Sequence, residues 1–269
     1  MPELPEVETV KNTLKNIVIG KKIIASNIYW DNIIAYPKPK EFKQKIKNQT
    51  INDVKRRGKW LMFELDDYFL LSHLRMEGKY FFKHEKDPLN KHEHVTFTFS
   101  DGTELRYHDT RKFGKMYLLD KENVNNVKPL SDLGLEPWDE KLTPNYLKSK
   151  FKTKPVKTEL LDQSIIVGIG NIYADEILFL SKINPEEIAS NLSTIKLKRI
   201  IENTKKVLET AINYGGTTIK SYESSEGVHG KFQSKLLVHT KENCPKCAAK
   251  ISKIVVGGRS TYFCPKCQK

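Results

Sequence analysis

The chain has 269 residues, 38% hydrophobic and 29% charged, which is long enough for two domains that each bury a core. No apolar run approaches the roughly 20 residues of a membrane span, and glutamates open the chain where a signal or transit peptide would be basic or apolar. These features exclude an integral membrane protein and predict a cytoplasmic location.

The charge balance is strongly basic. Lys and Arg total 46 against 33 acidic residues, which gives a net charge of +13. Such an excess favours a polyanionic partner. A lysine-rich surface that only solubilises the protein is the alternative, and charge alone does not separate the two.

The first predicted element is a helix near the N-terminus. After Pro5, apolar residues recur at spacings of three and four up to Gly20, which predicts a helix with one buried face. Pro5 and Glu6 suit the first turn of that helix. Pro2 and Glu3 precede it and need another explanation. The apolar positions are Val7, Val10, Leu14 and Ile17.

Short β-rich runs follow between residues 21 and 120. Several alternate apolar and polar residues, as in 94–99, which is typical of half-buried strands. Their close spacing predicts a β-sandwich, so residues 1–120 are expected to form one domain of helix and sandwich. The runs are KIIASNIYW, WLMFEL, YFLLSHL, YFF, VTFTF, ELRYH and KMYLL.

The second half of the chain changes to helical periodicity. Residues 121–142 are polar and interrupted by proline and glycine, which indicates a linker. A helical domain is expected over 143–219, its last helix ending at Gly215-Gly216. A Gly/Ser-rich connection over 220–238 and a module over 239–269 complete the chain. The expected helices are 144–151, 159–164, 172–181 and 193–214.

All four cysteines lie in the final module, as the pairs Cys244–Cys247 and Cys264–Cys267. Two Cys-x-x-Cys pairs at this separation supply four thiolates for one tetrahedral Zn²⁺. Two disulfides are the alternative, which a reducing compartment disfavours. A site closed by four cysteines has no open position for substrate, so the zinc is expected to be structural.

The segment between the cysteine pairs is predicted to be a β-hairpin with Gly257-Gly258 at its turn. The module is therefore a zinc ribbon. Arg259, just past the turn, is either an ordinary surface arginine or a contact for a phosphate.

Seven motifs follow one another along the chain: PELPEVET, KRRGKWL, HLRMEG, HDTRKFG, LLDQSIIVGIGNIYADE, GGTT and the four-cysteine tail. In this order they resemble the bacterial formamidopyrimidine-DNA glycosylases, which excise 8-oxoguanine and ring-opened purines. The resemblance spans the chain. It implies an α+β multidomain fold: an N-terminal helix plus β-sandwich, then a helix-two-turn-helix domain that ends in a four-cysteine zinc ribbon.

The resemblance gives the opening stretch a catalytic role. In the family the initiator methionine is removed and the next residue, here Pro2, is the nucleophile. An α-amino group has a pKa of about 8, against about 10.4 for lysine, so it needs less activation. A secondary amine that attacks a sugar C1′ forms an iminium, which acidifies the neighbouring C2′ proton. The resemblance makes Glu3 the acid/base and Lys59 a ligand of the lesion's phosphate, while Glu6 either supports the N-terminus or only caps the helix.

Other matched positions imply DNA contacts. A flipped nucleotide leaves a hole in the duplex, and the family fills it with Met, Arg and Phe, here Met76, Arg111 and Phe113. Without the family, Met76 and Phe113 would be expected in the core. Arg111 would face the orphaned base and prefer cytosine.

Further positions complete the implied DNA surface. Asn171 is expected to bind phosphates or to cap a helix, and His73 and Lys157 match other DNA-contacting positions. The loop over 220–231 would fold over the flipped purine. Two residues depart from the family: His239 replaces a phosphate-binding tyrosine, and Ala248 replaces a glycine.

The expected function is excision of oxidised purines from double-stranded DNA, followed by cleavage of the abasic site through β- and δ-elimination. We expect a monomer with one structural Zn²⁺ and no redox or nucleotide cofactor. An endonuclease VIII-type enzyme for oxidised pyrimidines is one alternative, although PELPE rather than PEGPE argues against it. A non-catalytic DNA-binding protein with a zinc ribbon is the other.

Overall fold

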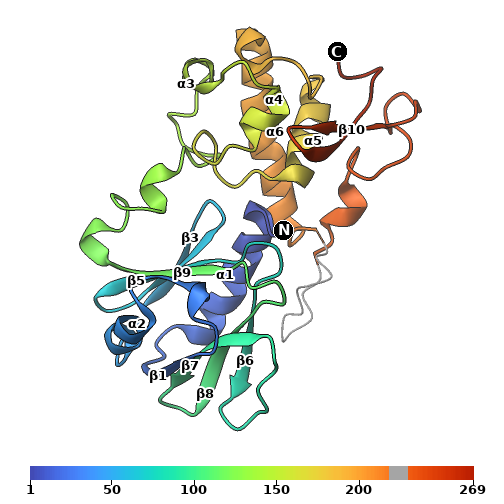
Figure 1. Ribbon diagram of the computed structural model, residues 1–269. Coiled ribbons are helices and arrows are strands. Elements are labelled where there is room, and N and C mark those ends of the chain that lie inside the picture. The colour runs from blue at the N-terminus through green and yellow to red at the C-terminus, as the bar shows by residue number, and fades with distance from the viewer. Residues whose placement is uncertain (218–229) are drawn as a thin grey trace. The chain divides into compact units, whose positions relative to one another are not determined.

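The computed structural model describes residues 1–217 and 230–269, and they form two compact units (Figure 1). The first unit contains Met1–Pro2 and Glu6–Ser131. The second contains Glu3–Pro5, Asp132–Thr217 and Lys231–Lys269. Within the described ranges, no helix combines the length and the apolar character that crossing a membrane requires.

The N-terminal helix α1, Leu4–Val18, follows the predicted period. Its apolar stripe is buried in the core of the first unit, and each fully buried Val or Leu contributes about 1.5–3 kcal/mol. Glu6 lies in the first turn, where a carboxylate favours the helix dipole. The buried stripe consists of Val7, Val10, Leu14 and Val18.

Within residues 1–131 the strands form the two sheets of a β-sandwich. One sheet has the order β1-β7-β8-β6 and the other β2-β9-β5-β4-β3, with β2 and β9 parallel and the other neighbours antiparallel. All seven predicted strands are present. They are β1 (Ile23–Ile28), β4 (Trp60–Glu64), β5 (Tyr68–His73), β6 (Lys79–His84), β7 (Glu93–Phe99), β8 (Thr103–His108) and β9 (Lys115–Asp120).

Between residues 31 and 57, four elements were not predicted: η1 (Asp31–Ile33), β2 (Ile34–Tyr36), α2 (Pro39–Ile46) and β3 (Asp53–Arg57). Helix α2 buries only Phe42 and Ile46 in a lysine-rich sequence, so its period is faint. Strand β3 reads DVKRR, and its charges hide the single buried residue, Val54.

The expectation that 94–99 is a half-buried strand is wrong, because every residue of β7 is buried. The polar side of the sheet is covered through Arg106 on β8. Its guanidinium donates to the carbonyls of His84 and Asp87 at 3.0 Å each and forms ion pairs with Glu93 and Glu104. The loop after β6 is thereby held over the sheet, and alternation in sequence cannot reveal a cover of this kind.

The second unit is helical, with its core between α3, α4, α5 and α6. Helix α6 has Ser193 as its N-cap, and Gly216 N donates to Ala211 O at 2.8 Å beyond its last turn, as predicted for a glycine cap. The helix expected over 159–164 instead spans Val156–Leu160, so it begins and ends earlier than predicted. The bounds are α3 (Pro144–Lys150), α4 (Val156–Leu160), α5 (Asn171–Ser181) and α6 (Thr194–Asn213).

The segment predicted as a linker contains the short helices η2 (Lys121–Asn123) and η3 (Leu130–Asp132). The two units divide within it, between Ser131 and Asp132. Farther along, Leu135 N donates to Ile165 O at 3.1 Å, so the end of this segment is part of the second unit.

The C-terminal hairpin pairs β10 (Ser252–Val256) with β11 (Arg259–Phe263), and Gly257-Gly258 form its turn. Both glycines have positive φ, +55° and +76°, which is the geometry that the sequence predicts for a tight turn. The ribbon packs against α5 through Phe179, which shares a small core with Val238 and Cys264.

Candidate active site and DNA-binding residues

Glu3 is buried and its carboxylate caps α5, a helix more than 160 residues away in sequence. Its Oε2 accepts from Gly170 N at 2.7 Å and from Tyr173 N at 3.4 Å, and its Oε1 accepts from Ile172 N at 2.9 Å. A helix N-terminus stabilises negative charge. A Cβ added to Gly170 would lie 2.3 Å from Glu3 Cδ. The absence of a side chain at Gly170 therefore lets the carboxylate sit at this position.

Pro2 is buried, directly before Glu3, while Met1 is 40% exposed. With Met1 attached, the proline nitrogen belongs to an amide and carries no reactive lone pair. Loss of the exposed Met1 would leave a secondary amine beside the fixed carboxylate. Glu6, also buried, lies one turn farther along in α1.

Lys59 follows Gly58 in the turn of the β3–β4 hairpin and is buried, so it is not a solvated surface charge. Arg56 braces this turn: its Nη1 donates to Gly58 O at 3.0 Å and its Nε to Glu8 Oε2 at 2.7 Å. Burial raises the pKa of Glu8, but bonds from Lys11 and Arg56 outweigh it and leave the pKa lowered. The charged brace ties the Lys59 turn to α1.

His73 ends β5 in a state suited to hydrogen bonding with an anion. Burial, aided by the charges of Arg75 and Lys59, lowers the pKa of His73 to about 3, so the ring is neutral. Its Nδ1 accepts from Arg75 N at 3.0 Å, which places the ring hydrogen on Nε2. The neutral ring thus keeps one N–H donor for a partner.

Met76, Arg111 and Phe113 lie in two loops of the first unit. Met76 is in the 74–78 turn between β5 and β6, and the other two are in the 109–114 loop between β8 and β9. Phe113 is 50% exposed and Met76 is partly exposed, so neither is a core residue. The Arg111 guanidinium lies 4.7 Å from the Phe113 ring centroid, a cation–π contact.

Lys157, which the resemblance places among the DNA-contacting positions, has a fully buried side chain. Its ammonium forms an ion pair with Asp175 at 2.7 Å and donates to Ser260 O at 3.1 Å and Thr261 Oγ1 at 2.8 Å. The buried ammonium is thus compensated by one carboxylate and two hydrogen-bond acceptors. Lys157 fixes the hairpin strand β11 to α4 and α5.

Asn171 is the first residue of α5, and Gly170 is its N-cap, so the capping alternative for Asn171 is wrong. Its Nδ2 donates to Ser260 O at 2.9 Å. This bond holds the start of α5 beside the hairpin, where Arg259 is exposed. Asn171 and Arg259 thus lie on one surface of the second unit.

Two acidic residues inside the apolar helix α5 organise this region, and the sequence interpretation overlooked both. Asp175 accepts from Tyr262 N at 3.2 Å and pairs with His239 Nδ1 at 2.7 Å. Glu176 accepts three backbone N–H groups, at residues 237 to 239. An adjacent acidic pair in NIYADEILFLS was the available signal, since buried carboxylates need partners.

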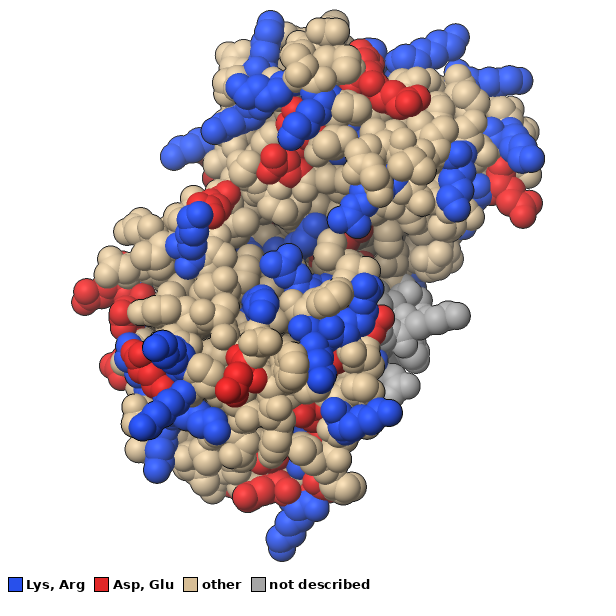
Figure 2. All heavy atoms as spheres, viewed as in Figure 1, with Lys and Arg blue, Asp and Glu red and all other residues tan. Residues whose placement is uncertain are grey.

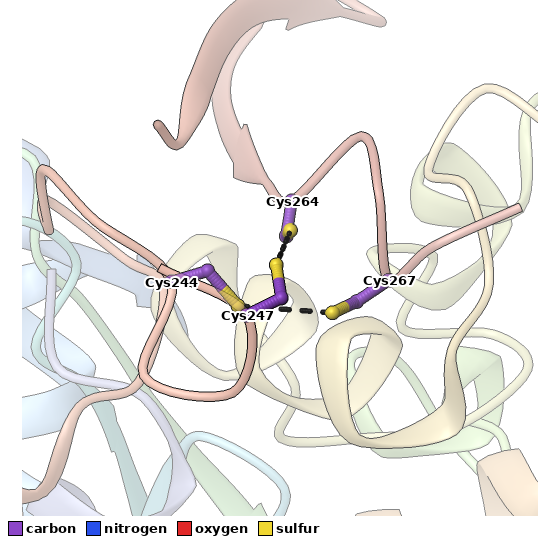
Figure 3. A group of neighbouring side chains, drawn as sticks. All are labelled: Cys244, Cys247, Cys264 and Cys267. Atoms are coloured by element: carbon purple, nitrogen blue, oxygen red, sulfur yellow. Dashed lines mark hydrogen bonds between the residues drawn. The ribbon is translucent and has the colours of Figure 1, made fainter. Parts of the chain in front are cut away.

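The four cysteine sulfurs lie within 4.8 Å of one another (Figure 3). No cysteine is in a disulfide, so that alternative is wrong. A hydrogen bond with Cys247, together with burial, raises the pKa of Cys267 to about 12. Four thiolates this close together would need a bound cation, and Zn²⁺ takes four cysteine ligands in structural sites.

Ala248 follows the second cysteine in a left-handed conformation, with φ of +57°. Its N donates to Cys244 O at 2.9 Å and closes the first cysteine turn. An L-residue with a Cβ pays about 1–2 kcal/mol in this conformation, which explains why a glycine would suit this position.

On the face shown in Figure 2, Lys and Arg side chains are spread over both units, with acidic side chains in smaller groups among them. This distribution agrees with a polyanionic partner.

Comparisons with known proteins match the chain along its length. Residues 1–116 match the formamidopyrimidine-DNA glycosylase N-terminal domain, 133–223 its H2TH domain, and 241–269 the zinc finger found in FPG and IleRS. The formamidopyrimidine-DNA glycosylase of Bacillus subtilis strain 168 is 50% identical over 273 residues, covering 100% of this chain and 99% of that protein. The chain belongs to the formamidopyrimidine-DNA glycosylase family.

Solved structures agree with this assignment. The Lactococcus lactis Fpg bound to DNA with an abasic site has a TM-score of 0.91 and 39% identity, with 99% of each chain covered. The same enzyme bound to DNA with an N7-benzyl-Fapy-dG matches at a TM-score of 0.91 and 40% identity over 100% of both chains. The fold class expected from the resemblance is confirmed, as is membership of a DNA glycosylase family.

Proposed function

We propose that the chain removes oxidised purines, 8-oxoguanine and formamidopyrimidines, from double-stranded DNA and then cleaves the abasic strand. Family membership supports the first activity. The observation that carries the proposal is the Glu3 carboxylate, held by three backbone N–H groups at the start of α5 and covalently next to Pro2.

In the proposed reaction, Met1 is removed and the Pro2 nitrogen attacks C1′ of the damaged nucleotide. The base leaves with a proton, and the nitrogen–C1′ bond becomes an iminium. Glu3 exchanges protons with the opening sugar. Loss of the acidified C2′ proton expels the 3′ phosphate, and a second elimination expels the 5′ phosphate. Hydrolysis of the iminium returns the amine.

The DNA-binding residues are assigned to two tasks. Lys59 and His73 in the first unit, and Asn171 and Arg259 in the second, bind backbone phosphates, which position the duplex without reading sequence. Met76, Arg111 and Phe113 enter the duplex and occupy the space of the flipped nucleotide. The predicted cap over the flipped purine, residues 220–231, falls mainly outside the described residues.

We propose one Zn²⁺ bound by Cys244, Cys247, Cys264 and Cys267, with a structural role. The metal offsets part of the negative charge of the four thiolates and fixes the two cysteine turns from which the β10–β11 hairpin extends. The hairpin carries Arg259, so the zinc acts on DNA affinity through the position of that side chain.

Cys264→Ser should release the zinc and weaken DNA binding, because a hydroxyl is a poor zinc ligand and Cys264 is a buried member of the site. The zinc content measured by metal analysis should fall from one ion per chain to almost none. The matched control is Ser252→Ala, at the start of the same hairpin. A Cys264→Ser protein that keeps stoichiometric zinc and full DNA affinity would contradict the assignment.

The substrate class is tested with duplexes that carry 8-oxoguanine opposite cytosine or thymine glycol opposite adenine. We expect faster single-turnover excision of 8-oxoguanine. Preference for thymine glycol would favour the endonuclease VIII alternative instead. Binding of both duplexes without excision of either base would favour the non-catalytic alternative.

A further inference from the structure

The turn that carries Met76 lies next to the loop that carries Arg111 and Phe113. The register between strands β6 and β8 brings the two together. Strand β6 begins directly after the 74–78 turn, and β8 ends directly before the 109–114 loop. These strands pair with Lys79 opposite His108. The residues next to that pair, Gly78 and Asp109, therefore lie side by side, and each opens into one of the two loops.

A buried tyrosine hydroxyl fills the space between the loops. Tyr107, on β8, is fully buried. A Cβ added to Gly78 would lie 2.3 Å from its hydroxyl oxygen, and one added to Gly114 would lie 1.7 Å from it. Such distances leave no room for a side chain, so both loops are in close contact with one hydroxyl group.

The Asp109 carboxylate holds the second loop from inside. It is fully buried; its Oδ1 accepts from Arg111 N at 3.0 Å and its Oδ2 from Gly114 N at 2.8 Å. The Tyr107 hydroxyl donates to the same Oδ2 at 3.4 Å. One carboxylate thereby fixes the backbone on both sides of Phe113 and joins it to the tyrosine.

Two outer bonds complete the linkage. Thr110 Oγ1 donates to the Glu77 carboxylate, which connects the two loops directly. His94 Nε2 bonds to Asp109 O at 2.9 Å and fixes the start of the second loop to β7. Within the first turn, Gly78 N donates to Leu74 O at 2.9 Å.

We propose that Tyr107 and Asp109 are positioning residues that hold the two loops as one rigid unit, so that Met76, Arg111 and Phe113 enter the duplex together. Neither residue contacts the reacting atoms. The proposal rests on the proposed function, because it assumes that these three side chains fill the space of the flipped nucleotide. A preformed set avoids ordering two separate loops at the moment of unstacking.

The test uses full-length protein without Met1 and compares Tyr107→Phe and Asp109→Asn with Tyr80→Phe. Tyr80 is a matched control, because it is buried beside Tyr107 with ring centroids 5.3 Å apart, but its hydroxyl bonds to Ser72 and not to the loops. Asn keeps the size of Asp109 but presents only one acceptor oxygen.

Three readouts separate positioning from general damage. The first is 2-aminopurine fluorescence opposite a tetrahydrofuran abasic analogue, which reports insertion without catalysis. The second is the ratio of 8-oxoguanine excision opposite cytosine to that opposite adenine. The third is borohydride trapping on a single-stranded abasic oligonucleotide, in which no base pair needs to be opened.

We expect Asp109→Asn to reduce insertion and excision about tenfold, and Tyr107→Phe several-fold, as the loss of buried hydrogen bonds implies. The cytosine-to-adenine ratio should move toward one because Arg111 is misplaced. Trapping on the single strand should be unchanged, and Tyr80→Phe should match the parent in all three.

Parent-like insertion and base ratio in both variants would overturn the proposal, as would a proportional loss of single-strand trapping. A parent that shows the insertion signal, which the variants lose, but that excises no 8-oxoguanine would overturn the proposed function while supporting the loop coupling.

Discussion

Protein that retains Met1 should form no borohydride-stable adduct with abasic DNA, whereas protein that begins at Pro2 should form one. The reason is that an amide nitrogen cannot attack C1′, while the free α-amine has a pKa of about 8 and is partly unprotonated at neutral pH. Intact mass measured on the two preparations, together with trapping yield, gives the result directly.

Pro2→Gly is the matched variant, because it keeps an α-amine after Met1 removal but makes it primary. Trapping should be weakened rather than lost. Equal trapping by protein with and without Met1 would show that another amine, such as a lysine, is the nucleophile.

Glu3→Gln should lower excision of the intact damaged base by about 10²–10⁴-fold, the loss expected for an acid/base group. It should also lower the free energy of unfolding by about 1–3 kcal/mol. A glutamine amide has one acceptor oxygen, and its NH₂ group cannot accept a hydrogen bond from the N–H groups of α5. Single-turnover excision and thermal unfolding measure the two effects separately.

Glu176→Gln is the control for the stability effect. Like Glu3, Glu176 accepts three backbone N–H groups in the second unit. Burial raises the pKa of Glu176, which these bonds oppose. We expect Glu176→Gln to keep most excision activity. If both variants lose excision in proportion to their stability, Glu3 is a helix cap and not an acid/base group.

The sequence predicted the helices and strands in which buried residues recur at regular intervals within one segment of the chain. All seven β-rich runs are strands, and α1 and α6 follow their apolar periods, because one packed face repeats in sequence. Helix α2 and strand β3 were missed, since each buries only one or two residues among many charges. The burial of β7 depends on a loop held by Arg106, which no local pattern encodes.

The sequence likewise predicted some features of the candidate site residues and not others. Motif position alone did not show that Lys157 is enclosed, because its three partners come from Asp175 on α5 and from Ser260 and Thr261 on β11. The alternative of a core position for Phe113 was excluded only by its 50% exposure. Cysteine spacing, in contrast, predicted the sulfur cluster, since ligands of one metal must converge.

The cap that Glu3 gives to α5 has a consequence for dissecting the chain. Glu3–Pro5 belong to the second unit, and Leu4 is part of its core. A C-terminal fragment that begins at Asp132 would keep helices α3 to α6 and the ribbon. It would still lack the Glu3 carboxylate that caps α5 and the Leu4 side chain of the core. During synthesis on the ribosome, the third residue must wait for residues 170–173 to emerge before its carboxylate is bound. The N-terminus is thus completed late, by the half of the protein that is made last.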